Sequence, residues 1–388
     1  MKLPLKYSAR SLLVRRGTVM MTVASIAFVV LVYLGVLSLA GGLKSAFRIS
    51  GDPAHVVVLR EGALSETSSF FSLERGREVM ALPGIAKNAE GSVLAAGEVM
   101  ILNNLPRRDG SLCNVTFRGV SPESFQLRPA LRIVDGRRFE PGKAELIVGR
   151  RLSERFPALG LGSELTLGQL TFRVVGIFDA AGSSFDSEVW GAAEDMSSAF
   201  RRTGYYSSAL LRAGSEAEAA ALVQRIEDDQ RLRLRALTEA EYYAQQTAAT
   251  TRQFVFLANM LAVIMAIGAC FAAANTMYAA VSARTREIAA LRVFGFKRRS
   301  IMGAFLLEAA LLGLVAGLIG MLLALPLNMI STGTTNFLTF SEITFSLRTT
   351  PMALVGGVLV AVLTGIIGGI PPAWSAARKP IAEAMRAV

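Results

Sequence analysis

Cysteine, histidine and tryptophan are scarce in this chain, and each scarcity narrows its possible functions. Its 388 residues include two cysteines, one histidine and two tryptophans. No cysteine–histidine spacing typical of a metal site occurs, so we predict no metal ligands. Cys113 falls in a polar region and Cys270 in an apolar run, so no disulfide is expected between them. His55 opens an apolar run and is interpreted as a strand-end residue rather than as a catalytic base.

The sequence also lacks the patterns of an enzyme. The phosphate-binding pattern GxxxxGK[ST] does not occur, so the chain cannot bind ATP by that route. Nothing else in the chain has the spacing of a catalytic centre. We therefore predict no catalytic residues and no cofactor bound by this chain.

Charge is sparse as well. Charged residues make up 18% of the chain, and 52% of its residues are hydrophobic. Three charge-free runs exceed the roughly 20 residues needed to cross about 30 Å of hydrocarbon. They are Thr18–Leu43, Gln253–Ala283 and Thr349–Ala377. A fourth run extends from Ser300 past Leu327, interrupted only by Glu308. The sequence therefore predicts four transmembrane helices, the first being a retained anchor because it is too long for a signal peptide.

The net charge of +11 comes from short segments beside these runs. Residues 42–252 hold 26 basic and 26 acidic side chains, which cancel. Residues 1–17, 284–299 and 378–388 together carry fourteen basic residues against two acidic ones. This is the positive-inside pattern, and it explains the charge without nucleic acid. It predicts that both termini and residues 284–299 are cytoplasmic, and that residues 42–252 lie outside.

The polar regions have their own patterns. Residues 4–16 have the periodicity of a basic amphipathic helix at the membrane surface, the alternative being an unstructured basic stop signal. Within residues 42–252, alternation predicts strands and periodicity predicts helices, in the order of two βαβ-like halves around a β-rich insertion near residues 121–170. The strands are Val56–Leu59, Val115–Val120, Thr171–Phe178 and Ser207–Arg212, and the helices are Ser72–Ala81 and Ser215–Asp228.

A long helix is predicted next. Thr238 and Glu241 have capping-box spacing, and few breakers follow until after Ala283. One helix of roughly 45 residues would be about 65 Å long, with its first third standing above the membrane as a stalk. The alternative is a bend near Arg252. Pro371-Pro372 is expected to disrupt the fourth transmembrane helix.

Two further features concern packing and coupling. Gly313 and Gly317 have GxxxG spacing, as do Gly365 and Gly369, which indicates close helix packing in the membrane. Residues 285–294 form a short charged helix with Ile288, Leu291 and Phe294 on one side, before the turn at Gly295. Such a helix can dock into a partner's groove, whereas a purely topogenic basic loop would need no amphipathic helix.

Residues 282–320 resemble the hallmark of the FtsX/MacB-type ABC permease family (type VII), whose pattern runs roughly RTREIGxLRAxGAxxxxI…ExxxLGLxGGxxG. The matching residues are Arg284, Thr285, Arg286, Glu287, Ile288, Leu291, Arg292, Gly295, Ile301, Glu308, Leu312, Gly313, Gly317 and Gly320. The chain departs from the pattern at Ala289, Val293 and Phe296. Residues 372–386 resemble the family's C-terminal ending, and residues 135–139, 145–149 and 172–177 resemble its external-domain signatures.

The resemblance implies an α-helical membrane protein with four transmembrane helices and an α/β extracytoplasmic domain that carries a small β-rich insertion. It implies a dimer with an identical copy or a paralogue, bound to separate cytoplasmic ABC ATPases that hold ATP and Mg. The coupling helix would carry Arg284 to Gly295. The implied segments are 1–17 cytoplasmic interfacial helix, 18–43 TM1, 44–237 periplasmic MacB-like domain, 238–252 stalk helix, 253–283 TM2, 284–299 coupling helix and loop, 300–328 TM3, 329–348 short periplasmic loop, 349–371 TM4 and 372–388 cytoplasmic tail.

The implied function is mechanotransmission in the bacterial inner membrane. ATP hydrolysis would drive export or extraction of a hydrophobic, lipid-like, lipoprotein or drug-like substrate, with a periplasmic adaptor or a lipoprotein carrier as a further partner. The alternatives are a permease that regulates a cell-wall hydrolase, a binding module without transport, and a secondary transporter. Glu308 is expected to pair with a basic residue of the coupling loop rather than to bind substrate or protons.

Overall fold

A computed structural model describes residues 16–335 and 341–378 of the chain. The predicted interfacial helix at residues 1–17 and most of the cytoplasmic tail lie outside the described residues. The chain divides into two compact units. The helical unit comprises residues 1–41, 252–330 and 347–388, and the α/β unit comprises residues 42–251 and 331–346.

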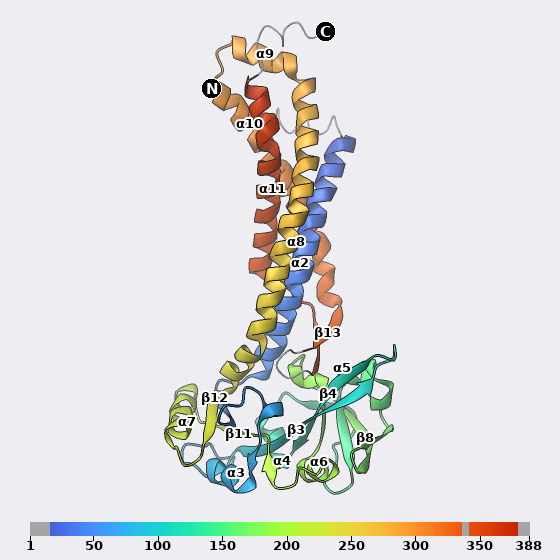
Figure 1. The fold of residues 1–388 in the computed structure, drawn as a ribbon, viewed down its shortest axis with the longest axis vertical. Helices are drawn as coiled ribbons and strands as arrows, with labels where there is room; N and C mark the ends of the chain where they lie inside the picture. The colour runs from blue at the N-terminus through green and yellow to red at the C-terminus, as the bar shows by residue number, and fades with distance from the viewer. Residues whose placement is uncertain (1–15, 336–340, 379–388) are drawn as a thin grey trace. The chain divides into compact units, whose positions relative to one another are not determined.

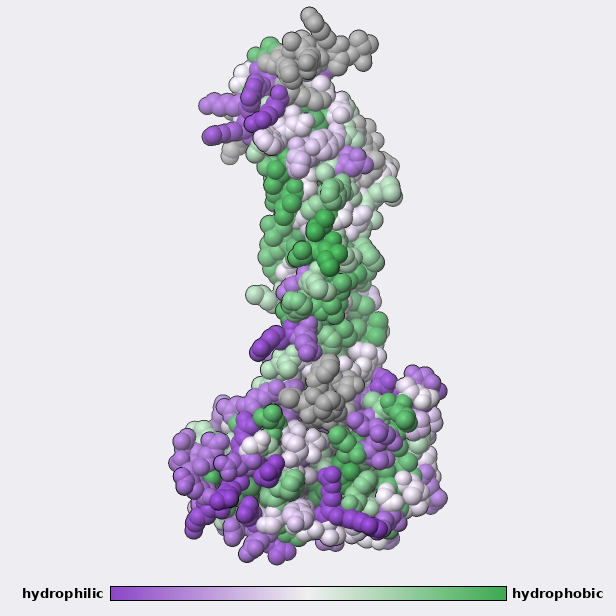
Figure 2. Space-filling view, viewed as in Figure 1, coloured by the Kyte–Doolittle hydropathy of each residue, from purple (hydrophilic) through white to green (hydrophobic). Residues whose placement is uncertain are grey.

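The described residues include four helices that are long and apolar enough to cross a membrane (Figure 1). They are α2 (Arg16–Ser50), α8 (Glu239–Ala283), α10 (Arg298–Ala324) and α11 (Pro351–Arg378). Their exposed side chains are largely apolar (Figure 2), as expected for a surface that faces lipid. α8 is a single helix of 45 residues, as the breaker-free sequence predicts.

Shorter elements join the helices of this unit. α9 (Thr285–Val293) lies between α8 and α10, and the 3-10 helix η4 (Leu325–Met329) follows α10. The expected break at Pro371-Pro372 is wrong, because α11 continues through both prolines to Arg378. The Pro372 ring lies one helical turn after Gly368, which has no side chain to crowd it. Membrane helices also tolerate the backbone hydrogen bonds lost at proline better than soluble helices do.

The α/β unit is built on one ten-stranded mixed sheet, in the order β12-β1-β11-β3-β4-β9-β6-β8-β5, with β7 paired to β8. A smaller pair joins β2 to β10. The strands are β1 (His55–Arg60), β2 (Phe71–Ser72), β3 (Ala95–Pro106), β4 (Leu112–Val120), β5 (Arg132–Gly136), β6 (Glu145–Gly149), β7 (Glu164–Leu167), β8 (Leu170–Asp179), β9 (Glu188–Ala192), β10 (Tyr205–Tyr206), β11 (Ser208–Arg212) and β12 (Leu234–Thr238). The helices are η1 (Glu66–Ser68), α3 (Leu73–Met80), α4 (Pro122–Leu127), α5 (Arg150–Arg155), η2 (Pro157–Leu159), η3 (Ser184–Ser187), α6 (Ala193–Ala199) and α7 (Glu216–Asp228).

The first and last thirds of this unit form two interlocked split βαβ motifs. β1 and β3 each pair antiparallel with β11, and β11 and β12 each pair antiparallel with β1. The order β12-β1-β11-β3 is that of a ferredoxin-like βαββαβ fold, with α3 and α7 as its crossover helices. Two βαβ-like halves are therefore present, as predicted, and each encloses a strand of the other. The second strand of the first half is β3, however, and the predicted strand Val115–Val120 is part of β4 in the insertion.

The insertion differs from the expected small separate element. β4, β9, β6, β8 and β5 extend the same sheet beyond β3, so the inserted part runs from the end of β3 to the start of β11. The reason is the β3–β4 hairpin, whose register from Val99↔Gly119 to Pro106↔Leu112 continues the sheet without a break. The inserted part has an apolar core around Phe117 and Phe172, and the ferredoxin-like part has a separate one around Val58 and Leu222.

Capping residues fix the helix starts that the sequence predicts. The Ser215 side chain accepts a hydrogen bond from the Glu218 N–H at the start of α7. At α8, Thr238 Oγ1 accepts from the Glu241 N–H, and Glu241 Oε2 accepts from the Thr238 N–H. This reciprocal pair is a complete capping box.

The segment between α10 and α11 contains structure that the sequence does not predict. β13 (Ser331–Thr335) and β14 (Glu342–Ser346) pair antiparallel, from Ser331↔Ser346 to Thr335↔Glu342. These residues belong to the α/β unit, although the sequence places them between two transmembrane helices.

Candidate functional site

Among the described residues, no three or more histidine, cysteine, aspartate or glutamate side chains are placed so that they could hold a metal ion. Instead, clustered polar side chains of the described residues join helices and strands to one another. These lie at α9, within the helical unit, and at the start of α8 in the α/β unit.

The ends of α9 are sharply defined. The Gly295 N–H bonds to the Arg292 carbonyl and the Phe296 N–H to the Leu291 carbonyl, which is the Schellman arrangement. Gly295 has φ +89°, a conformation that suits glycine. The helix therefore stops at a fixed point, with the basic segment Lys297–Arg299 following at once.

The apolar residues of α9 divide between two faces. Ile288 is buried in a core with Ile301 and Phe305, so it is not available for docking as the sequence suggested. Leu291 is half-buried. Val293 and Phe294 are 62% and 79% exposed, and they form the accessible apolar end of the helix. Arg286 and Glu287 are exposed beside them.

Glu308 is paired within the helical unit. Arg284 Nη1 lies 3.2 Å from Glu308 Oε2, and the carboxylate is almost fully buried. This is the pairing that the sequence favours, and it joins the segment before α9 to α10. A charge pair at this position suits a structural tie better than an ion pathway.

The four predicted packing glycines lie where α10 meets α11. A methyl group at Gly313 would lie 2.6 Å from the Ala361 carbonyl oxygen, and one at Gly365 would lie 2.5 Å from the Ala309 carbonyl oxygen. A methyl group at Gly317 would lie 3.0 Å from the Ala361 Cβ, and one at Gly369 would lie 2.6 Å from the Ala309 Cβ. The two backbones therefore touch, as small-xxx-small spacing allows.

The α/β unit contains a buried charge cluster made of Glu66, Glu98, Arg118, Arg128 and Glu188. Arg118 is 1% exposed and donates from all three nitrogens of its guanidinium. Its Nε and Nη2 bind both oxygens of Glu188 at 2.7 and 2.9 Å. Its Nη1 and Nη2 bind both oxygens of Glu66 at 2.9 and 3.1 Å, and Nη1 also binds Glu98 at 2.6 Å.

A second arginine completes the cluster. Arg128 forms a bidentate pair with Glu98 and stacks over the rings of Phe185 and Trp190, at 4.8 and 5.3 Å from their centroids. Trp190 Nε1 donates to Glu188 Oε2 at 2.7 Å. Every carboxylate in the cluster thus accepts from an arginine, as buried charges require.

These contacts set the protonation of the cluster. Burial by itself would raise the pKa of Glu98, but the charges and hydrogen bonds of Arg128 and Arg118 lower it to about 2. Burial would likewise lower the pKa of Arg118, yet the charges of Glu188, Glu66 and Glu98 raise it well above its usual value. Glu98 and Arg118 are therefore held in their charged forms and are unsuited to acid–base catalysis.

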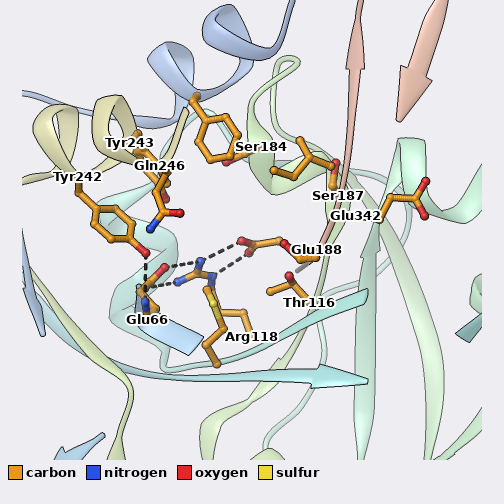
Figure 3. A pocket seen from close by; sticks show the side chains of 14 residues that line it. Glu66, Thr116, Arg118, Ser184, Ser187, Glu188, Tyr242, Tyr243, Gln246 and Glu342 are labelled. Atoms are coloured by element: carbon orange, nitrogen blue, oxygen red, sulfur yellow. Dashed lines mark hydrogen bonds and ion pairs between the residues drawn. The ribbon is translucent and has the colours of Figure 1, made fainter. Parts of the chain in front are cut away.

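The start of α8 packs against this cluster. Figure 3 shows Tyr242, Tyr243 and Gln246 beside Glu66 and Arg118 around a small cavity. The Tyr242 hydroxyl accepts from the Glu66 N–H at 3.1 Å, and the Tyr243 ring contacts Phe47 of α2 at a centroid distance of 5.5 Å. The cavity volume of about 40 Å³ suits one or two waters rather than a ligand.

A second tie joins the same segments. Glu239, the first residue of α8, accepts from the Asp52 N–H at 3.0 Å and lies 2.9 Å from His55 Nδ1. His55 begins β1, as predicted, and its ring is buried. The last residues of α2 lead into Asp52, so this tie fastens the start of α8 to the chain that follows α2.

The paired strands β13 and β14 are held by a third cluster, here called the β14 clamp: Arg107, Arg155 and Glu342. The Glu342 carboxylate is fully buried and lies 2.9 Å from Arg107 Nε and 2.8 Å from Arg155 Nη2. The Thr344 N–H donates to Ser187 Oγ at 2.8 Å. The clamp thus attaches the segment between α10 and α11 to the main sheet.

Sequence reasoning missed both the buried charge cluster and the β14 clamp. Their members are far apart in the chain, and single charged residues in a strand resemble solvent-facing positions. The available signal was Arg118 itself, which stands within an otherwise uncharged strand. Both faces of β4 are buried there, so its charge needs buried partners.

Comparison with known proteins gives a consistent result. The family model described as MacB-like periplasmic core domain matches residues 19–229, and the one described as FtsX-like permease C-terminal matches residues 259–381. A pyoverdine export ATP-binding/permease protein, PvdT of Pseudomonas putida KT2440, is 29% identical over 260 residues, covering 62% of this chain and 38% of that protein. The macrolide export ATP-binding/permease protein MacB of Shewanella oneidensis MR-1 is 24% identical over 373 residues, covering 85% and 55%.

Solved structures resemble this chain only distantly. The extracellular domain of the ABC-type transporter YknZ has 14% identity and a TM-score of 0.36, covering 47% of this chain and 99% of that domain. The periplasmic region of MacB from Actinobacillus actinomycetemcomitans has 10% identity and a TM-score of 0.36, covering 48% and 89%. The chain spans between about a third and just over half of the length of the curated relatives that it matches.

Proposed function

Because the chain belongs to the family of MacB-like and FtsX-like ABC transporter permeases, we propose that it couples ATP hydrolysis by a separate cytoplasmic ATPase to work outside the cytoplasm. The proposed location is the bacterial inner membrane, with both termini and α9 in the cytoplasm. The proposed assembly is a dimer with an identical copy or a paralogue. ATP and Mg would be held by the ATPase.

The observation that carries the proposal is the continuity of α8. Its first residues are fastened within the α/β unit by the Glu239 tie and by Tyr242 beside the buried charge cluster. The helix then runs without a break to Ala283, and α9 begins two residues later. A continuous hydrogen-bonded helix resists bending, so a push on α9 would be passed along it.

The polar groups of the helical unit favour this mechanism over a hydrophilic channel. Glu308 is already paired with Arg284, and the α10–α11 contact is closed by glycines. Substrate would therefore be moved on the outer side, as a hydrophobic, lipid-like, lipoprotein or drug-like molecule, with an adaptor or carrier protein as a further partner. Regulation of an extracytoplasmic enzyme would use the same ATP-driven step and differ only in the partner.

Docking of the ATPase on α9 is tested by purification of the tagged chain from its host in mild detergent. We expect an ABC ATPase to co-purify and to hydrolyse ATP. Phe294→Asp should abolish its recovery, because a charge would replace the most exposed ring of α9. Leu112→Asp, at a 71% exposed position of the α/β unit, is the matched control and should leave recovery unchanged.

Two results would contradict the proposal. One is the absence of any ATPase under these conditions, combined with normal chain folding. The other is unchanged recovery with Phe294→Asp and also with Arg286→Glu and Glu287→Arg.

A further inference from the structure

A groove with a volume of about 580 Å³ lies in the α/β unit, and none of its lining residues belongs to the buried charge cluster or the β14 clamp. It is lined by α3, by the starts of β3, α4 and α6, and by β10 with the residues before it. Figure 1 shows these helices at one end of the unit. The volume falls within the range of small-molecule sites, about 300–1,000 Å³.

The sheet topology produces this groove. β4 and β9 are parallel neighbours, with Val120 opposite Ala192. The chain turns into α4 at Pro122 and into α6 at Ala193, so two parallel strands end side by side and both lead into helices. The crevice at the carboxyl ends of parallel strands is where many α/β proteins bind ligands.

Aromatic residues form one wall. Methyl groups at Gly76 and Gly97 would each lie 2.5 Å from the Tyr206 ring, so both glycines are needed to seat it. Tyr205 is 51% exposed and packs edge-to-face on Phe70, which is 58% exposed. Tyr205 and Tyr206 line the groove, and the exposed ring of Tyr205 offers an apolar surface to a ligand.

The groove also carries charges of both signs. Glu123 and Glu194 stand in the first turns of α4 and α6, and Arg77 stands on α3. Within the described residues, none of the three forms an ion pair. Each charge also suits its own helix, because Glu123 and Glu194 lie in first turns and Arg77 lies in the last turn of α3. The groove nevertheless brings charges of both signs, unpaired among the described residues, to one surface.

We propose that this groove binds a small, largely apolar zwitterion, with its ammonium group toward Glu123 and Glu194 and its carboxylate toward Arg77. A short apolar peptide with free ends has this chemistry. Such binding needs neither an ATPase nor transport, so it can be tested independently of the proposed function.

The first test uses the full chain in lipid nanodiscs, with empty nanodiscs as background. The probe is the peptide Leu-Phe-Ala-Leu with free ends, compared with its N-acetyl form and its C-terminal amide. We expect saturable binding of the free peptide and about three- to fivefold weaker binding of each blocked form, because each loses one partly exposed ion pair. Equal binding of all three forms, or no saturable binding, would overturn the proposal.

Charge variants then show which side chains contact the amino end of the peptide and which contact its carboxyl end. The double variant Glu123→Gln/Glu194→Gln should bind the free and acetylated peptides alike, and Arg77→Gln should bind the free and amidated peptides alike. Glu216→Gln and Arg108→Gln remove exposed charges elsewhere in the α/β unit and should change nothing. Equal affinity for tetraphenylphosphonium, a cation without a carboxylate, would show that the groove does not recognise a zwitterion. The three peptide forms on the unaltered chain decide the question even where a variant fails to fold.

Discussion

At the scale of single residues, the charges of the buried charge cluster, of Glu308 and of Glu342 in the β14 clamp are buried with partners of opposite sign. Arg118 and Glu308 each stand between uncharged neighbours in the chain, and each has a partner of opposite sign within hydrogen-bond distance. The partner of Glu308 was foreseeable, because this residue lies about two turns into its apolar run, beside the basic loop that begins at Arg284. The partners of Arg118 were not, because they come from η1, β3 and β9 and only the folded sheet brings them together.

The lowered pKa of Glu98 predicts how stability changes in acid. Its folded pKa of about 2 lies below the ordinary value of 4.5, so the stabilisation is complete above about pH 4.5 and is lost as the pH falls toward 2. The loss should be on the order of 3 kcal/mol. Unfolding followed by the fluorescence of buried Trp190, on the full chain in detergent, measures it.

Glu98→Gln provides the comparison. The variant should be less stable than the unaltered chain near neutral pH and should lose less stability across this window. Glu216→Gln, an exposed carboxylate on α7, should follow the unaltered chain. If Glu98→Gln loses as much stability in acid as the unaltered chain, Glu98 is not the group that causes the loss.

At the scale of elements, the transmembrane helices could be predicted because a charge-free run of such length has few alternatives. The capping boxes at α7 and α8 could be predicted because they are local. The β13–β14 pair was missed because β13 (Ser331–Thr335) is polar and has no alternation of apolar and polar residues. The long strand β3 was missed because its first residues, 95–97, are alanine and glycine, which are poor strand formers. The continuation of α11 through Pro371-Pro372 was also missed, because the rule against prolines weighs hydrogen bonds and not the fit of neighbouring helices.

The glycines between α10 and α11 give a matched test of packing. Gly313→Ala should destabilise the helical unit by about 1–3 kcal/mol, because the methyl group meets the Ala361 carbonyl. Gly303→Ala lies on the same helix with open space around it, so it should be neutral or slightly stabilising. Thermal unfolding in detergent distinguishes them, and equal melting temperatures would refute the packing role.

The continuity of α8 is tested at Ala249, an exposed position in its first third. Ala249→Pro should break the helix, at about 3 kcal/mol, whereas Ala249→Gly costs only about 1 kcal/mol and keeps it. We expect Ala249→Pro to retain ATPase binding but to lose the ATP-dependent change in labelling of a cysteine placed at Leu112. If the change persists in Ala249→Pro, α8 is not the transmitting element.

At the scale of the whole molecule, the positive-inside pattern predicts the orientation. In a chain carrying Cys113→Ser and Cys270→Ser, a membrane-impermeant thiol reagent should label Leu112→Cys in intact spheroplasts. Phe294→Cys should be labelled only after the membrane is opened. The reverse labelling pattern would show that the chain has the opposite orientation in the membrane.

The native Cys113 is a poorer probe for this purpose. It is 7% exposed, and burial, together with Glu342, raises its pKa to about 11. Its thiolate is therefore scarce at neutral pH, so a failure to react would not report the side of the membrane on which it lies.

The β14 clamp has a practical consequence for anyone who wishes to produce the α/β unit separately. A recombinant fragment cut at residues 42 and 251 would lack β13 and β14, and it would leave Arg107 and Arg155 without the carboxylate that lies between them. Such a fragment would expose these two arginines without a counter-charge, together with the surface at Ser187 that Thr344 covers in the full chain. A faithful soluble version needs residues 331–346 supplied as well, either spliced on through a designed linker or added as a synthetic peptide.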